Sequence, residues 1–249
     1  MNRRLLYTLL SPILLIAVWY LLASFTPKYL FPYPHTVVYA LIELFRRMNL
    51  LENMLYTVIR VTIGYVVGVL LGIVLGILVL LSRLLQNLIY PIVAFIIVTP
   101  SFAFVPLLMI WVGLNDWLPV TAIIICTAFP IIYAFMSSHK FINRELIAAA
   151  MIDGASNTYI VLHIILPLSI SHLATILRYE AGHSWRLGFV TEYIALSNGL
   201  GALMMYAYST LRVDEVIALL IIIGILTYAF QQAITLLENT LLKRWGIIQ

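Results

Sequence analysis

The stretch LYTVIRVTIGYVVGVLLGIVLGILVLL, residues 55–81, carries a single charged side chain, Arg60. A membrane-spanning helix needs about 20 mainly apolar residues, because each residue advances it by about 1.5 Å across about 30 Å of hydrocarbon. The stretch exceeds that length, so it predicts a helix that crosses a bilayer. Its character is typical of the whole chain of 249 residues, of which 63% are hydrophobic and 10% are charged.

This composition excludes several classes of protein. A soluble domain could not hide so much apolar surface, and a disordered chain needs low hydrophobicity and high charge. Cys126 is the single cysteine, so a secreted domain held together by intrachain disulfides is excluded. The net charge of +4 fits basic residues at cytoplasmic helix ends better than nucleic-acid binding.

Six windows of the sequence are long and apolar enough to span a membrane. We therefore predict an all-α, polytopic membrane protein with six transmembrane helices, forming one transmembrane domain over 1–249 with its core at about 55–240. The first window is expected to be a retained signal-anchor, because its apolar run is too long for a signal peptide and residues 25–27 make a poor cleavage site. The windows are residues 5–24, 55–81, 88–112, 118–137, 166–196 and 216–237.

Basic residues are unevenly distributed between the segments that separate these windows. If the N-terminus lies in the cytoplasm, the cytoplasmic segments carry seven basic residues and the opposite side carries four. An excess of Lys and Arg marks the cytoplasmic side, so we expect a multi-pass protein of the cell (inner or plasma) membrane with both termini cytoplasmic. The cytoplasmic group is Arg3, Arg4, Arg83, Lys140, Arg144, Lys243 and Arg244, and the outer group is Lys28, Arg46, Arg47 and Arg212.

The segment between the first two windows also has a helical pattern. Pro32 and Pro34 lie in an extended stretch that stops the preceding helix. Apolar residues then recur at near-helical spacing over 37–48. This pattern predicts an amphipathic helix that lies along the outer membrane face.

Glycine recurs at every fourth residue of the window 55–81, at Gly64, Gly68, Gly72 and Gly76. On a helix these residues form one nearly continuous strip, which lets another helix approach closely in lipid. Two interpretations stay open: packing within one helical bundle, which we favour, and a sliding or homodimer surface. Arg60, near the outer end of the window, is expected to be a structural anchor that reaches the interface, with a substrate role second.

The window 88–112 is interrupted by Pro100 and Pro106, with Ser101 directly after the first proline. Irregular backbone inside a membrane persists only where neighbours, water or a cavity satisfies it. Helix breaks of this kind often mark substrate pathways in transporters. We therefore treat Pro100, Ser101 and Pro106 as candidate pathway residues, with kinked packing as an equal alternative.

The window 166–196 carries more ionisable residues than lipid exposure allows, so these side chains are expected to face protein or water. Arg178 and Arg186 lie about 80° apart on the helix, and His183 lies near the same face. Such a basic face could hold an anion through guanidinium contacts. Internal charge pairing is the alternative for either arginine. The ionisable residues are Arg178, Glu180, His183, Arg186 and Glu192.

The other polar residues match no catalytic or metal-binding motif. The five histidines lack zinc-type spacing with Cys or acidic residues, and the sequence contains no nucleophile elbow, HExxH or phosphate-binding GxxxxGK[ST]. We therefore expect that the chain is not an enzyme and has no ATPase site, cofactor or metal of its own. Cys126 is expected to be an inert buried residue.

The largest polar insertion, about 138–166, predicts a helix–turn–helix elbow on the cytoplasmic surface. Strong helix formers from Glu145 to Ile152 stop at Gly154, a favourable residue after a helix end. Pro167 then suits the first turn of the next helix. Nothing else in the chain obviously covers the apolar face of this elbow, so a partner protein is expected to do so.

The elbow resembles a motif of permeases from binding-protein-dependent ATP-binding-cassette (ABC) importers, E-A-A-x-x-x-G-x9-I-x-L-P. One position departs, because Ala148 stands where the family has Glu, and Glu145 lies three residues earlier on a nearby helix face. The resemblance implies that Asp153 and Ala155 join the matched residues in coupling to an ATPase. The matched residues are Ala149, Ala150, Gly154, Ile164, Leu166 and Pro167.

The resemblance extends over nearly the whole chain and is strongest to the nitrate/sulfonate/taurine branch. It is carried by residues 31–34, by Arg60-Val61 with Gly64-Tyr65, by residues 100–107 with 111–113, and by Glu192 followed by Gly199-Leu200-Gly201. It implies a type I ABC importer permease fold and a homodimer in membrane lipid. It also implies two ATPase subunits, which bind ATP and Mg²⁺, and an external substrate-binding protein.

These features together predict a permease that carries a small anionic solute by alternating access. The pathway is expected between the two copies of the chain. A self-sufficient secondary transporter or channel is the alternative, in which the charges of 166–196 form a proton or ion relay. An intramembrane enzyme is a third class, for which the sequence shows no nucleophile–base or metal constellation. The expected pathway residues are Pro100, Ser101, Pro106, Arg178, His183, Arg186 and Glu192.

Overall fold

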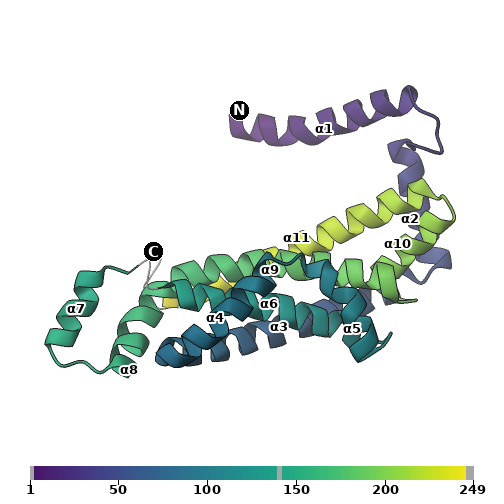
Figure 1. The fold of residues 1–249 in the computed structure, drawn as a ribbon. Helices are drawn as coiled ribbons and strands as arrows, with labels where there is room; N and C mark the ends of the chain where they lie inside the picture. Colours follow the sequence, from purple (N-terminus) through teal and green to yellow (C-terminus); the bar gives the residue numbers. More distant parts are fainter. Residues whose placement is uncertain (1–2, 139–141, 245–249) are drawn as a thin grey trace. The chain divides into compact units, whose positions relative to one another are not determined.

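The computed structural model describes residues 3–138 and 142–244 (Figure 1). All regular structure within these ranges is helical, as expected for an all-α protein. Lys140 and residues 245–249 lie outside the described residues. The elements are α1 (Arg3–Ser24), α2 (Pro34–Arg47), α3 (Leu50–Leu81), α4 (Arg83–Val98), η1 (Ser101–Phe104), α5 (Val105–Val112), α6 (Trp117–Ser137), α7 (Arg144–Ile152), α8 (Asn157–Ile160), η3 (Val161–Ile165), α9 (Leu166–Ala195), α10 (Leu200–Ser209) and α11 (Val213–Arg244).

Three described helices are long and apolar enough to cross a membrane by themselves: Leu50–Leu81, Trp117–Ser137 and Val213–Thr240. Two bent pairs raise this number to five if each pair is one span. α1 runs over the 22 residues Arg3–Ser24. The count of six stays a prediction, because two of the windows are bent pairs of helices.

The chain divides into two compact units, which we describe separately. The first comprises Met1–Tyr56 with Glu192–Ile225, and the second comprises Thr57–Thr191 with Leu226–Gln249. The cavity and the elbow described below belong to the second unit.

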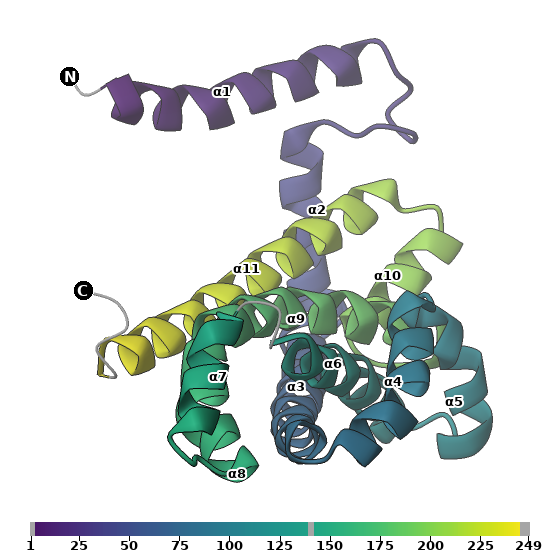
Figure 2. The same cartoon turned by 60° about the vertical axis from the view of Figure 1, so that its left-hand side comes forward.

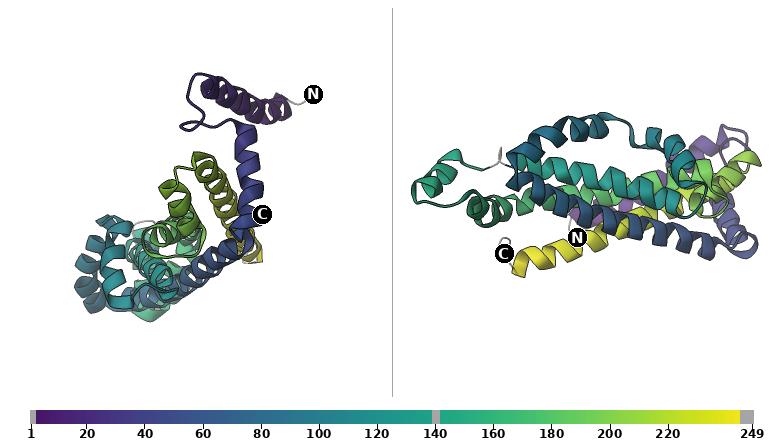
Figure 3. Two further views of the ribbon diagram at one scale, coloured as in Figure 1. Left: turned by 90° about the vertical axis from the view of Figure 1, so that its right-hand side faces the viewer. Right: turned by 60° about the horizontal axis from the view of Figure 1, so that its bottom comes forward.

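In the second unit, the glycine strip of α3 lies against α6, and the two helices run side by side (Figure 3). A Cβ atom added to Gly64 or Gly72 would lie 2.8 Å from the Cβ of Ile123 or Ile131. At Gly68 it would lie 2.9 Å from the Cβ of Thr127. The strip therefore serves contact between helices of one chain, which is the first of the two interpretations.

The window 88–112 is a broken helix in which α4 meets η1 and α5 at a bend of 104° (Figure 2). Thr99 ends α4, and its hydroxyl donates a hydrogen bond to the carbonyl of Phe95 at 2.8 Å. Pro100 follows in extended backbone, and Pro106 lies in the first turn of α5. Val93 of α4 packs in a buried cluster with Val79, Ile132 and Met136. The prolines therefore interrupt this window while α4 keeps its place against α6.

In the first unit, the predicted amphipathic segment forms α2 and buries Val37, Ala40 and Leu44. Its start is linked to α1, because the indole of Trp19 donates a hydrogen bond to the carbonyl of Pro32 at 3.0 Å. Arg212, before α11, contacts Glu43 of α2 at 3.1 Å and Asp214 at 3.0 Å. Hydrogen bonds to these two carboxylates raise the pKa of Arg212 above its ordinary value.

Candidate functional site

The predicted cytoplasmic elbow contains a helix with well-defined ends. α7 begins after Asn143, whose side-chain oxygen accepts the N–H of Glu145 at 2.9 Å. At the other end Gly154 has a φ of 83°, and the N–H of Ala155 donates to the carbonyl of Ala150 at 2.9 Å. This closure of a helix end favours glycine, because the left-handed region is strained for other residues.

One side of α7 packs on the elbow itself, and the other side is uncovered. Ile147, Ala150 and Ala155 pack against a buried cluster of Ile142, Ile160, Val161 and Ile165, together with Ile164. The opposite surface exposes large apolar side chains, with Ile152 at 86% the most exposed of them. In Figure 1, α7 and α8 project beyond the ends of α4 and α6. The exposed positions are Glu145, Leu146, Ala148, Ala149, Met151, Ile152 and Asp153.

The second helix of the elbow, α8, leads into α9, which is bent by 56° between Asn157–Ile170 and His172–Ala195. Ser156 caps α8 by accepting the N–H of Tyr159 at 3.2 Å. A π-helical turn, Val161–Ile165, leads into α9, which begins at Leu166 with Pro167 in its first turn, as predicted. Because proline lacks an N–H, a widened turn here accommodates the missing backbone hydrogen bond. α7 is therefore connected to α9 through the turn at Gly154, α8 and the π-helical turn.

A cavity of about 610 Å³ lies beside the broken helix. Its wall comes from the break between α4 and η1, from α6 and from α9. The lining residues are Ile96, Ile97, Val98, Thr99, Pro100, Ser101, Cys126, Pro130, Tyr133, His172, Thr175, Ile176, Tyr179, Glu180 and His183.

A chain of hydrogen bonds crosses the wall of this cavity. The hydroxyl oxygen of Ser101 lies 3.1 Å from Nε2 of His183, and Nδ1 of His183 lies 3.1 Å from Oε2 of Glu180. Residues 180 and 183 share a face because they are three apart on α9. Glu180 is buried, at 1% exposure. The chain thus links the broken helix to α9 through side chains 82 positions apart in sequence.

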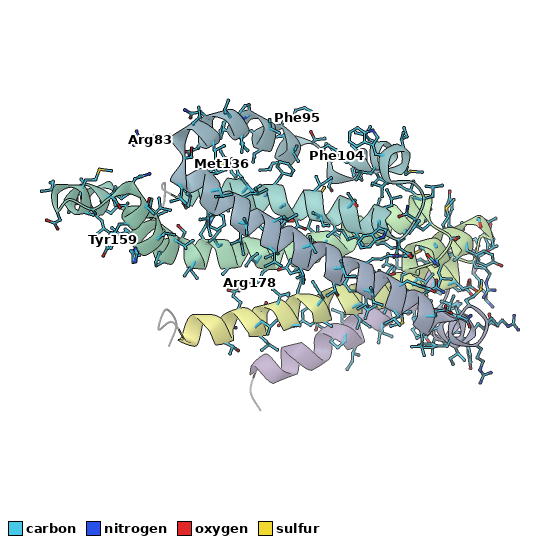
Figure 4. All side chains as sticks on the ribbon, turned by 90° about the horizontal axis from the view of Figure 1, so that it is seen from below. Arg83, Phe95, Phe104, Met136, Tyr159 and Arg178 are labelled. Atoms are coloured by element: carbon cyan, nitrogen blue, oxygen red, sulfur yellow. The ribbon has the colours of Figure 1, made fainter. Side chains whose placement is uncertain are left out.

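The two arginines of α9 do not line the cavity. Arg178 extends toward α11, where its Nε lies 3.0 Å from Oε2 of Glu238 (Figure 4). Arg186 is exposed, donates from Nε to the carbonyl of Gly182 at 3.3 Å and lies 6.0 Å from the ring centroid of Tyr179. Arg178 therefore forms an internal ion pair, which is the alternative to an anion site. The guanidinium of Arg186 is exposed, one turn beyond His183.

Glu192 and Pro106 lie away from the cavity. Glu192 belongs to the first unit, where it is fully buried and its Oε2 accepts the N–H of Gly201 at 3.1 Å, in the first turn of α10. The preceding turn contains Gly199, at a φ of 102°, whose N–H donates to Asn53 at 2.7 Å. Glu192 is thus a cap for α10, and Pro106 is the first-turn proline of α5.

Sequence reasoning missed the tyrosines and polar residues that complete the cavity wall. His172, Thr175, Tyr179 and His183 recur every three or four residues and share one face of α9. That periodicity was available in the sequence, whereas the contribution of Tyr133 from α6 was not. Arg60, expected to be a structural anchor, is buried, and its Nε donates at 3.1 Å to Asp116, whose side chain is exposed.

Comparison with known proteins gives relatives of one kind. A candidate ABC transporter permease protein of Methanocaldococcus jannaschii is 37% identical over 141 residues, which are 56% of this chain and 53% of that protein. The taurine transport system permease protein of Escherichia coli is 27% identical over 159 residues, which are 64% of this chain and 58% of that protein. The chain thus spans little more than half the length of these two relatives.

A solved structure and a family model add to this comparison. A chain of the MetNI methionine ABC transporter in an inward-facing conformation superposes with a TM-score of 0.64 at 18% identity, covering 78% of this chain and 96% of that one, so the type I importer permease fold is shared. The sequence model of binding-protein-dependent transport system inner membrane components matches residues 68–244, which include the elbow, the broken helix and the cavity. The chain therefore belongs to this family of inner-membrane transport components.

Proposed function

We propose that this chain is the permease subunit of an ABC importer, through which a small anionic solute crosses the membrane. A second copy of the chain completes the pathway, and an external binding protein delivers the solute. Two ATPase subunits, which hold ATP and Mg²⁺, dock on α7. The observation that carries the proposal is the elbow, in which the capped helix α7 exposes Leu146, Met151 and Ile152. Apolar surface of this kind is typical of a protein-interaction site.

The elbow can act as the lever between the ATPase and the membrane. ATP can drive transport only if it favours one arrangement of the helices over another, since equal binding to both would shift nothing. α7 is held to α8 and η3 by the cluster of Ile142, Ile160, Val161 and Ile165, and the helix continues into α9. A pull on α7 is therefore proposed to reach the cavity wall through α8 and α9.

The solute pathway is proposed to follow the polar face of α9. Thr175, Tyr179 and Arg186 are exposed on this face, and His172 and His183 are half-buried beside them. In a homodimer, two such faces would enclose a polar route. The taurine permease relative supports a solute that carries an anionic group, and the exposed guanidinium of Arg186 supplies a positive charge on this route.

The alternative of a self-sufficient transporter is favoured by one observation. The chain from Ser101 through His183 to Glu180 has the groups and spacing of a proton relay. This alternative predicts uptake by the purified chain in vesicles that contain no ATPase. The importer predicts uptake only when ATPase subunits and ATP are present.

Co-purification with the ATPase tests the proposal. The chain is co-expressed with a candidate ABC ATPase subunit and purified in detergent, and the bound ATPase is quantified. Ile152→Glu places a charge in the docking surface and is expected to release most of the ATPase, whereas Ile152→Met keeps an apolar side chain and should retain it. Equal retention by both variants, or no ATPase on the wild-type chain, would refute the proposal.

A further inference from the structure

A second cavity, with a volume of about 400 Å³, lies on the other side of α9 from the first one. Its wall comes from α3, α6, α9 and α11, and all of the lining residues belong to the second unit. From α9 this cavity takes Ile170, Leu173 and Leu177, whereas the first cavity takes polar residues such as Thr175 and Tyr179. α9 therefore has a polar face toward one cavity and an apolar face toward the other.

The wall of the second cavity is almost entirely aliphatic or aromatic. Among the described residues that line it, Tyr65 and Glu238 are the two with polar groups. The hydroxyl of Tyr65 donates to the carbonyl of Leu177 at 3.0 Å, and Oε2 of Glu238 lies 3.0 Å from Nε of Arg178. Both groups thus have partners within the protein. A cavity with so apolar a wall binds apolar molecules rather than water, and its volume lies within the range of about 300–1,000 Å³ that is usual for ligand pockets.

Lipid is the apolar material that surrounds the helices of this wall. α3, α6 and α11 each contain an apolar segment long enough to span a membrane. On α3 the lining residue Ile73 is followed by the exposed Val74, and on α11 the lining residue Leu237 is itself 63% exposed. The edges of the cavity on these two helices are therefore continuous with apolar surface of the kind that acyl chains cover in a bilayer.

The place of the cavity on α9 favours lipid over a second copy of the chain. In the proposed homodimer, the polar face with Thr175 and Tyr179 turns toward the pathway between the two copies. The apolar face with Leu173 and Leu177 then turns away from the partner copy and toward the bilayer. This step of the argument rests on the proposed function.

We propose that one acyl chain of a membrane phospholipid occupies this second cavity as a bound ligand. The acyl chain contacts Leu166 and Ile170 before the 56° bend of α9, and Leu173 and Leu177 after it. It fills the space on the side of the bend that faces away from the pathway. An empty space there would leave these side chains without neighbours to pack against.

Phospholipid that stays bound during purification tests the proposal. The full chain is purified from membranes in detergent, and phospholipid is counted per chain by native mass spectrometry. Ala174 is 5% exposed and lines the cavity, so Ala174→Phe fills part of the space. Ala233→Phe puts the same side chain at an exposed position of α11 outside the cavity and is the matched control. The wild type and the control should retain phospholipid equally, and Ala174→Phe should retain less by about threefold or more.

Photolabelling of the wild-type protein is a second measurement that depends on no variant. The protein is reconstituted into phosphatidylcholine vesicles in which some lipid carries a diazirine in one acyl chain. Light expels N₂ from the diazirine, and the carbene that forms inserts into a nearby C–H bond. Fragmentation of peptides by mass spectrometry should locate label on Ala174 and Leu177 in the cavity. Leu236, which is 66% exposed on α11, should also be labelled and shows that the reagent works.

Three results would overturn the inference. The first is label on Leu236 without label on Ala174 or Leu177, and the second is equal retention of phospholipid by Ala174→Phe and Ala233→Phe. The third is a photochemical cross-link from a diazirine amino acid at Leu177 to a second copy of the chain, which would assign the cavity to the homodimer. Failure of the proposed function is distinct from these results, because loss of ATPase binding would refute the importer and leave label on Ala174 in place.

Discussion

The carboxylate of Glu192 occupies the space that a side chain at residue 199 would need, because a Cβ built on Gly199 would collide with it. Gly199 also has a φ of 102° and a ψ of 169°, a region that is essentially restricted to glycine. Glu192 and Gly199 therefore act together, because the lack of a side chain at Gly199 leaves room for the carboxylate that caps α10. In the sequence this relationship is visible only as a spacing of seven residues.

Gly199→Ala is expected to destabilise the protein by about 1–3 kcal/mol, from backbone strain and the collision together. Glu192→Gln keeps the shape but weakens the charge-assisted hydrogen bond to Gly201, and about 1–2 kcal/mol should be lost. Thermal unfolding of the purified protein in detergent measures both changes. An unchanged melting temperature for Gly199→Ala would show that the turn does not need glycine.

Alanine at Gly72 should loosen the contact between α3 and α6. The added Cβ would lie 2.8 Å from the Cβ of Ile131, and forcing an extra methyl group into a packed contact costs about 1–3 kcal/mol. Gly224→Ala is the matched control, because nothing lies within 4 Å of the added atom there. Thermal unfolding should place Gly72→Ala below the wild type and Gly224→Ala at or above it. The reverse order would contradict the described packing.

The end of α7 should tolerate asparagine better than alanine. A non-glycine residue in the left-handed region costs about 1–2 kcal/mol, and asparagine enters this region more readily than alanine. No neighbour lies within 4 Å of a Cβ at Gly154, so the effect is one of conformation rather than of collision. Stimulation of ATPase activity in the reconstituted complex should therefore fall more in Gly154→Ala than in Gly154→Asn. Equal stimulation of ATPase activity in the two variants would show that the backbone conformation at the end of α7 does not control coupling.

Neutralising the two arginines of α9 should separate the pathway from the ion pair. Arg186→Gln removes an exposed charge from the polar face, and uptake of an anionic test solute such as an aliphatic sulfonate should fall by about tenfold, equal to about 1.4 kcal/mol. Arg178→Gln, which breaks the contact with Glu238, should alter thermal stability more than uptake. Uptake into vesicles that contain the whole transporter gives the comparison. A larger loss of uptake for Arg178→Gln would place the pathway on the other side of α9.

Local features were predictable from the sequence, and contacts between distant segments were not. The elbow depends on helix formers followed by Gly154, and the break at Pro100 depends on proline chemistry, so both could be located in advance. The direction of the 104° bend depends on how α4 packs against α6, which no local pattern encodes.

The same limit applies to the charges of α9. Arg178 and Arg186 point in similar directions around the helix. Arg178 nevertheless pairs with Glu238, which is 60 residues away in sequence. The sequence predicts a pathway role for Glu192 because it places this residue inside a single spanning window, residues 166–196. Its partners, Gly201 and the turn at Gly199, lie beyond the end of that window.

The bare surface of α3 has a mechanical consequence. Four glycines bring the backbone of α3 directly against the side chains of Ile123, Thr127, Ile131 and Phe135 of α6, and such close packing favours movement of the two helices as a single piece. An opening of the second unit is then expected at its joints, one of which is the stretch Thr99–Ser101 at the 104° bend. A covalent cross-link between α3 and α6 should therefore leave transport intact, whereas a cross-link across Thr99–Ser101 should block it.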